Sequence, residues 1–348
     1  MEFLMFVPVV DYNQKPLMPT KPSRARKWIK SGKATGFFKK GVFCVRLNQE
    51  PSDRKTQEIA VGIDPGSKRE AYTVKSQAHT YLNVLSETVD WVKLGVKHRR
   101  EMRRSRRFRN TRYREARFGN RNHKKLPPST KARWDLKLRV SKWLTKLFPI
   151  TLFVVEDIQA KTKKGQKKWN KSFSPLEVGK KWFYTKLLDL GKVWTKQGYQ
   201  TKELRDSLGL KKSRSKLADK FECHNVDSWV LANCAVGGHS IPDNKEILKI
   251  VPLQLHRRQL HAFQFESGGI RRSYGGTRSL GFKRGSLVKH KKLGLCFVGG
   301  TSKDRISLHN LETGKRLTQG SKVEDCQFKT YLSWRTGGVV SSIAVKTA

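Results

Sequence analysis

The chain has 348 residues, and its 74 Lys and Arg against 28 Asp and Glu give a formal net charge of +46 at pH 7. Such an excess of positive charge predicts a polyanionic partner, above all nucleic acid. No apolar stretch approaches the roughly 20 residues of a membrane-spanning helix, and residues 1–10 lack the flanks of a signal peptide. We therefore expect no membrane partner. The five cysteines show no CxxC spacing, which fits a reducing cytoplasm.

Residues 1–55 form the first predicted unit. Residues 3–10 and 41–47 are apolar strand candidates, and residues 16–20 are predicted as a turn. Residues 23–30 carry four basic side chains on a short predicted helix.

The next unit, residues 56–96, is predicted to contain three strands separated by turn-forming residues. The strand candidates are 59–64, 70–74 and 81–87. The composition then changes sharply.

Residues 97–125 form an arginine-rich segment with 14 Lys or Arg and only two acids. Aromatic residues Phe108, Tyr113 and Phe118 lie among the arginines. Arginine pairs with phosphates and also stacks on bases. A helix with charge on every face is unstable alone, and bound phosphates would neutralise its positive charge. The alternative is that this segment is a solvated tail. The arginines expected to bind nucleic acid are Arg99, Arg100, Arg103, Arg104, Arg106, Arg107, Arg109, Arg112, Arg114 and Arg117.

Residues 126–244 are predicted to mix helices and strands. A helix is expected after Pro128 with Ser129 or Thr130 as its N-cap, and a buried strand follows at residues 152–156. Residues 245–348 contain repeated glycine pairs between short apolar runs, which predicts a β-rich domain.

Three acidic positions stand at the ends of apolar elements: Asp64 and Glu156 follow predicted strands, and Asp227 lies in the sequence His224-Asn225-Val226-Asp227. Each alone has an ordinary explanation, since Asp-Pro-Gly is a common turn and His and Asp suit helix ends. Together, acid, acid and His-x-x-Asp follow the order of an RNase H-like α/β fold. Gathered carboxylates repel one another unless divalent cations lie between them, as in two-metal nucleases.

Strand parity decides whether Glu156 or the adjacent Asp157 faces the site, and the sequence leaves both open. A second nuclease site of the HNH type is not expected. Residues 157–223 contain no histidine, and His224 has no second histidine at suitable spacing downstream.

Several motifs, in order along the chain, resemble a known family. The sequences around Asp64, Glu156 and Asp227 look like the three parts of a split RuvC domain, and the arginine-rich segment looks like the bridge helix of CRISPR type II effectors. Pro16-Leu17-Met18-Pro19 resembles the PLMP signature of their transposon-encoded relatives. Residues 253–260, 281–285, 314–317 and 322–326 resemble the same group. The chain is most similar to the IsrB family of OMEGA systems, which are relatives of IscB without the HNH insertion.

The resemblance implies an α/β fold: an RNase H-like RuvC core with an inserted bridge helix, a small N-terminal domain and a β-rich C-terminal domain. Its divisions would be a PLMP domain at 1–55, RuvC part I at 56–96, the bridge helix at 97–125, RuvC parts II and III at 126–244, and a domain reading a target-adjacent motif at 245–348.

The implied activity is nicking of the non-target DNA strand, guided by an ωRNA. Asp64 would bridge two Mg²⁺ ions, with Mn²⁺ as a possible substitute; Glu156 and Asp227 would complete their shells, and His224 would be the general base. Further nucleic-acid contacts would come from Arg257, Arg258, Lys283 and Arg284. The resemblance implies a protein that is monomeric within its ribonucleoprotein and associated with the prokaryotic nucleoid.

Two other classes remain open. A non-catalytic RNA-binding scaffold would bind without metal-dependent cleavage. A guide-independent, structure-specific nuclease would cleave without RNA.

Overall fold

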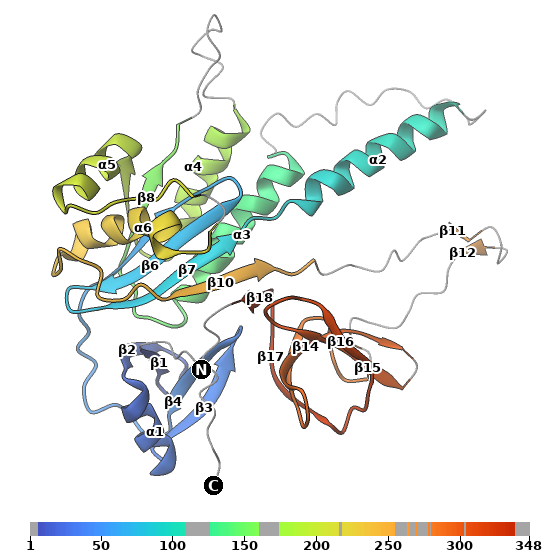
Figure 1. Ribbon diagram of the computed structural model, residues 1–348, viewed down its shortest axis with the longest axis horizontal. Coiled ribbons are helices and arrows are strands. Elements are labelled where there is room, and N and C mark those ends of the chain that lie inside the picture. The colour runs from blue at the N-terminus through green and yellow to red at the C-terminus, as the bar shows by residue number, and fades with distance from the viewer. Residues whose placement is uncertain are drawn as a thin grey trace, which may run out of the picture. The chain divides into compact units, whose positions relative to one another are not determined.

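The computed structural model describes residues 6–108, 126–159, 174–215, 218–254, 263–264, 269–270, 278, 280–302 and 304–337 (Figure 1). The chain divides into two compact units. Unit 1 comprises Met1–Asn13, Pro19–Ser52 and Glu246–Ala348, and unit 2 comprises Gln14–Met18 and Asp53–Lys245. Within the part of the chain that the structure describes, no helix is both long and apolar enough to cross a membrane.

Unit 2 is built on a mixed sheet. Its strands are β5 (Ile59–Asp64), β6 (Arg69–Ser76), β7 (Thr80–Glu87), β8 (Leu152–Asp157) and β9 (Lys192–Gln197). They lie in the order β7-β6-β5-β8-β9. β6 is antiparallel to β5 and β7, whereas β8 runs parallel to β5 and β9. This order and these directions confirm the RNase H-like core expected from the sequence.

Helices cover both faces of this sheet: α3 (Pro128–Leu144), α4 (Pro175–Leu188), α5 (Gly198–Ser207) and α6 (Phe221–Val236). Side chains of β6 point alternately to the two faces of the sheet, so their contacts show which helix covers each face. Thr73 shares a hydrogen bond with Ser228 of α6, whereas Glu70 bonds Lys137 of α3. α6 and α3 therefore pack on opposite faces (Figure 1).

α2 (Trp91–Phe108) contains the described part of the arginine-rich segment. It begins before residue 97, where the arginine-rich composition starts. Residues 109–125 lie outside the described residues, so the bridge helix expected at residues 97–125 stays a prediction.

Unit 1 contains segments from both ends of the chain. The N-terminal elements are β1 (Val7–Val10), β2 (Pro16–Thr20), which straddles the unit boundary, α1 (Pro22–Lys30), β3 (Ala34–Lys39) and β4 (Val42–Leu47). β4 pairs with β1 in parallel and with β3 antiparallel.

The C-terminal part of unit 1 is β-rich, as expected. Its five-stranded antiparallel sheet has the order β16-β15-β14-β13-β17. The strands are β13 (Ser286–His290), β14 (Gly294–Ser302), β15 (Arg305–Asn310), β16 (Arg316–Ser321) and β17 (Cys326–Tyr331). β10 (Ile247–Pro252) pairs with β18 (Trp334–Gly337), and β11 (Phe263–Gln264) pairs with β12 (Gly269–Ile270).

Two local predictions were wrong. Residues 16–20 form strand β2 rather than a turn, because proline is tolerated at strand starts and in edge strands. α3 begins at Pro128 with Pro127 in the N-cap position, not with a Ser129 or Thr130 cap. Proline suits the first helical position because its missing N–H would have no partner there.

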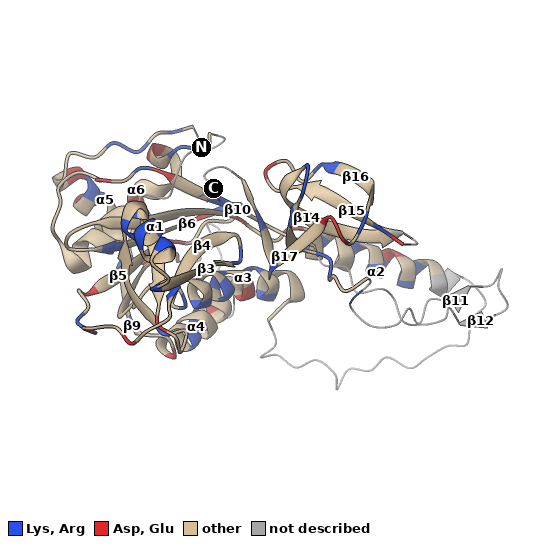
Figure 2. Cartoon of the chain, turned by 90° about the horizontal axis from the view of Figure 1, so that it is seen from below, with Lys and Arg blue, Asp and Glu red and all other residues tan. Residues whose placement is uncertain are grey.

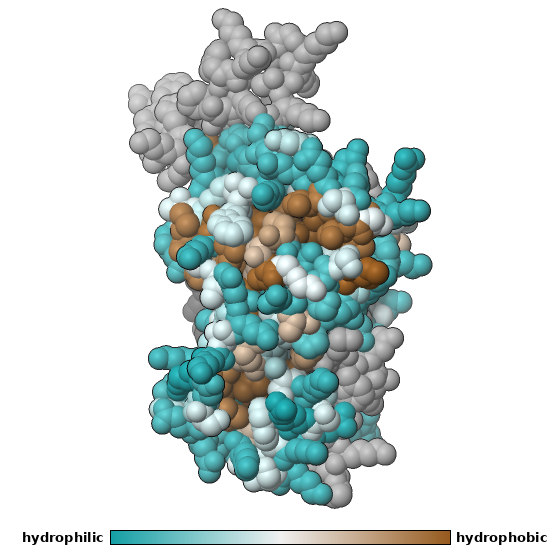
Figure 3. Space-filling view, turned by 90° about the vertical axis from the view of Figure 1, so that its left-hand side faces the viewer, coloured by the Kyte–Doolittle hydropathy of each residue, from teal (hydrophilic) through white to brown (hydrophobic). Residues whose placement is uncertain are grey.

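Exposed apolar side chains in unit 2 include Ile158, Leu188, Trp194 and Tyr199. On the face drawn in Figure 3, hydrophobic patches are interrupted by hydrophilic residues. Scattered exposure of this kind is common in folded proteins and identifies no site by itself.

Candidate metal centre and nucleic-acid surface

Three carboxylates meet at one end of the sheet in unit 2. Asp64 ends β5, Glu156 lies near the end of β8, and Asp227 belongs to α6. Each offers an oxygen, and these oxygens all lie within 4.8 Å of one another. Asp227 is buried, whereas Asp64 and Glu156 are half-buried.

The register of two parallel strands brings the first two acids together. Gly62 pairs with Val154 and Ile63 with Val155, so Asp64 and Glu156 occupy the next position on neighbouring strands. Because side chains alternate along a strand, both acids point to the same face of the sheet as Gly62. This is the face that α6 covers.

Gly62 lets α6 come close enough to complete the cluster. A Cβ atom at residue 62 would lie 1.8 Å from the carbonyl oxygen of Ser228. Any side chain here would therefore push α6 away from β5, and with it Asp227, the neighbour of Ser228 in the chain.

Asp157 lies on the opposite face of the sheet from Glu156. Its carboxylate is 2.8 Å from the Lys180 ammonium and accepts hydrogen bonds from Tyr184 and Gln197. Burial opposes ionisation of Asp157, but these hydrogen bonds outweigh it and lower the pKa. In this geometry Glu156, and not Asp157, belongs to the cluster.

The cluster strongly disfavours full ionisation. Burial, followed by repulsion from Asp64, raises the pKa of Glu156 to about 8. Burial also raises the pKa of Asp64, against the attraction of Lys212. Clustered oxygen ligands with suppressed ionisation are the donor set that a hard divalent cation stabilises. The three residues therefore fit Mg²⁺ or Mn²⁺.

Two cations that the sequence analysis did not identify touch the cluster. Lys212 contacts Asp227 Oδ2, and its Nζ is 3.7 Å from Asp64 Oδ2. Arg205 Nη1 donates to Asp227 Oδ1 at 2.8 Å. Both lie outside any recognisable motif, and a single lysine or arginine carries little signal in a chain with 74 of them.

His224 lies one helical turn before Asp227 but makes a different contact. Its Nε2 is 3.0 Å from Arg69 Nη1, which also lies 2.9 Å from Asp219 Oδ1. Burial, followed by the positive charge of Arg69, lowers the pKa of His224. The imidazole is therefore neutral at neutral pH, and in this structure Nε2 accepts from Arg69.

We expect Mg²⁺ to raise the melting temperature of the protein, because a ligand that binds only the folded cluster stabilises it, by about 2.7 kcal/mol at 100 times its Kd. The raised pKa of Glu156 sets the pH dependence. In metal-free protein its stabilising contribution is present below the ordinary value of 4.5 and is lost as pH rises through about 8. Metal binding requires the deprotonated form of Glu156, so the increase in melting temperature caused by Mg²⁺ should grow as pH rises over this range.

Thermal denaturation with and without Mg²⁺ measures this effect. Glu156→Gln should lose most of the shift, and Asp157→Asn, its neighbour on the opposite face, should keep it. A shift that is the same at every pH and in both variants would contradict the metal assignment.

The predicted nucleic-acid-binding residues are only partly described. On α2, Arg99, Arg100, Arg103 and Arg104 are exposed, and Arg99 and Arg103 donate to carbonyl oxygens one turn back. Figure 2 shows basic positions along the α2 ribbon in blue. In unit 1, Lys283 is half-buried and Arg284 is exposed. For Arg106 and Arg107 only the backbone is described. The positions outside the described residues are Arg109, Arg112, Arg114, Arg117, Arg257 and Arg258.

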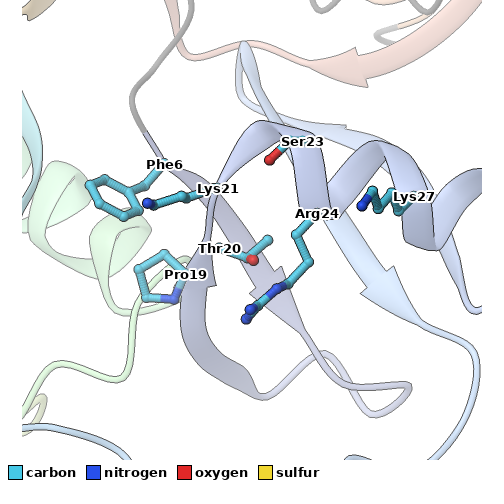
Figure 4. Close-up of a pocket in the computed structure, with 7 residues that line it drawn as sticks. All are labelled: Phe6, Pro19, Thr20, Lys21, Ser23, Arg24 and Lys27. Carbon is cyan, nitrogen blue, oxygen red and sulfur yellow. The ribbon is translucent and has the colours of Figure 1, made fainter.

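A basic pocket lies beside α1 in unit 1. Its volume is about 410 Å³, and its lining residues are Phe6, Pro19, Thr20, Lys21, Ser23, Arg24 and Lys27 (Figure 4). The three basic residues recur every third position, which places them along one side of the start of α1. The lining contains no acid, so the pocket adds to the positive surface.

The fold and the acidic cluster define an RNase H-like α/β protein with a candidate divalent-metal centre, which suggests a nuclease. Residues 7–173 match the family described as RRXRR protein.

Two solved structures show weak similarity to the chain. The RuvC of T. thermophilus in complex with a Holliday junction substrate is 13% identical, with a TM-score of 0.30; the match covers 52% of this chain and 98% of that one. The yeast mitochondrial Holliday junction resolvase is 11% identical, with a TM-score of 0.26; the match covers 52% of this chain and 78% of the resolvase. No match was found among curated proteins.

Proposed function

We propose that the chain is an RNA-guided DNA nickase of the IsrB type, which cuts the non-target strand of a guide-matched duplex beside a target-adjacent motif. The observation that carries the nuclease activity is the group of three carboxylates on the RNase H-like sheet, with oxygens within 4.8 Å of one another. The guide RNA is proposed from the sequence resemblance and from the net charge of +46.

Each residue of the cluster has a proposed role. Asp64 would ligate both ions, and Glu156 and Asp227 would each complete one shell. Divalent ions held there would polarise a phosphoryl oxygen and activate water. Arg205 and Lys212 would hold Asp227 in position, because Arg205 contacts its Oδ1 and Lys212 its Oδ2.

His224 remains the proposed general base. Its lowered pKa keeps the imidazole able to accept a proton at neutral pH. Because Nε2 accepts from Arg69 in this structure, proton transfer at that atom requires Arg69 to move away.

The exposed arginines of α2 are proposed to contact nucleic-acid phosphates. Each phosphate contact that is lost should reduce the slope of log K against log salt by about one. Changing Arg99, Arg100, Arg103 and Arg104 together to Ala should therefore flatten the slope by up to about four.

Binding titrations at several salt concentrations test this prediction. Four exposed lysines, changed together to Ala, provide a control of equal charge: Lys142, Lys181, Lys192 and Lys202. Equal slopes in the two variants would show that α2 contributes only general charge.

The proposed function predicts single-strand cleavage. A single carboxylate cluster suits one in-line displacement, while pairing with the guide holds the target strand. Supercoiled plasmid bearing the target should become open circles with Mg²⁺ and the co-purified RNA, without early linear product.

The same assay separates the rival classes. Linear product with ends on both strands at the guided site would contradict a nickase. Cleavage after removal of the RNA would indicate a guide-independent nuclease, and binding without cleavage would indicate a scaffold.

A further inference from the structure

Two exposed aromatic rings lie side by side on β17 of unit 1. Phe328 is 44% exposed and Tyr331 is 38% exposed. Their ring centroids are 4.8 Å apart, with 55° between the ring planes. Neither ring is among the residues of the hydrophobic core formed by Val288, Cys296 and their neighbours.

A β-bulge brings these rings to the same face. Residues three apart on a regular strand point to opposite faces. Here Phe328 pairs with Val288 and Tyr331 with Ser286, because the register shifts between Val288 and Leu287. Val288 and Ser286 are two residues apart, so their partners share a face. Bulges commonly redirect side chains in this way at functional positions.

Two cations lie over the Tyr331 ring. Lys283 Nζ lies 5.1 Å from the centre of the Tyr331 ring, and the Arg278 guanidinium lies 5.7 Å from it. Tyr331 thus holds two cations next to Phe328.

This combination matches the requirements of one ligand. Aromatic rings stack on nucleobases, and cations beside them reach the phosphates on either side. An apolar partner would gain from the rings but would have to desolvate the cations.

We propose that Phe328 is a stacking platform for an unpaired nucleobase, with Tyr331 packed against it and Lys283 and Arg278 contacting the adjacent phosphates. The site lies outside the carboxylate cluster and is a binding site rather than a catalytic one. The inference rests on nucleic acid as the partner of the proposed function, but it does not depend on cleavage.

The test compares two single strands of about 10 nucleotides, one with bases and one abasic with the same phosphates. Binding to the full-length protein, freed of co-purified RNA, is measured in EDTA, so that failed nicking and failed stacking are separate results. Phe328→Ala should weaken binding of the normal strand about 5- to 100-fold and leave the abasic strand unchanged. Lys283→Ala should weaken both strands equally.

Two further variants control for folding and for general aromatic contacts. Phe328→Tyr should restore the preference for bases, because it keeps the ring face. Tyr12→Ala, which removes another exposed aromatic residue of unit 1, should keep the preference.

DNA and RNA strands form the two arms of the experiment, and the arm with the larger loss identifies the source of the base. Equal losses for normal and abasic strands, or no loss in either arm, would overturn the proposal. Self-association of the protein that disappears in Phe328→Ala, without any effect on strand binding, would also overturn it.

Discussion

Asp64→Ala should abolish metal-dependent nicking and leave RNA and target binding close to that of the unchanged protein. Asp64 supplies one of the three carboxylates of the cluster, and its Oδ2 lies 3.7 Å from the Lys212 ammonium. Changes to residues that only orient metal ligands cost about 10- to 100-fold, so loss of a ligand should cost more than about 100-fold. The variant should fold, because Asp227 keeps Arg205 and Lys212 as partners and one repulsive charge is removed.

Asp157→Ala is the matched control, since it removes a carboxylate next to Glu156 in sequence but on the opposite face. Lys180 keeps Glu177 as a partner at 2.8 Å, so this variant should fold and keep nicking within about tenfold. Full nicking by Asp64→Ala, or loss of nicking by Asp157→Ala together with activity in Glu156→Ala, would contradict the site as described.

The sequence predicted the strands that carry the site because their burial has a local signature. β5 and β8 are short apolar runs that end in an acid, and both are buried along most of their length. The order of the acids then indicated the RNase H-like core. Asp227 was identified as the third acid because His224-x-x-Asp227 follows the two strand acids in the order of that fold.

The choice between Glu156 and Asp157 depended on how β8 pairs with β5, and the sequence of one strand alone does not determine that pairing. Arg205 of α5 and Lys212, in the segment after it, reach Asp227 from positions that no sequence motif identifies. The close approach at Gly62 likewise depends on the position of Ser228 in α6, 166 residues later in the chain. These features are tertiary, so a single sequence gives no local signal for them.

The association of the two chain ends in unit 1 has the same origin. Phe38 of β3 packs against a core that contains Leu287 and Phe297. The sequence shows two apolar segments separated by the whole of unit 2, and nothing in either segment identifies the other as its partner.

Lys137→Met should destabilise the protein by about 3–5 kcal/mol at neutral pH, because it leaves the buried Glu70 without its counter-ion. The Glu70 side chain is 0% exposed and that of Lys137 is 5% exposed. Glu70 otherwise accepts from Tyr72 at 2.9 Å, which cannot replace a full positive charge. The pair joins α3 to β6, and α3 precedes the strand that carries Glu156, so loss of packing here should also reduce nicking.

The pH dependence distinguishes an unpaired charge from a simple packing defect. Burial already raises the pKa of Glu70, and removal of Lys137 should raise it further. A raised pKa in the folded state means that stability is lost as pH rises, so the deficit of Lys137→Met should be largest at alkaline pH and shrink toward the ordinary value of 4.5. The double variant Glu70→Gln/Lys137→Met removes both charges and should recover much of the stability at neutral pH. Urea unfolding of the three proteins across this pH range measures the effect, and an equal deficit at every pH without recovery in the double variant would show that Lys137 acts through its shape alone.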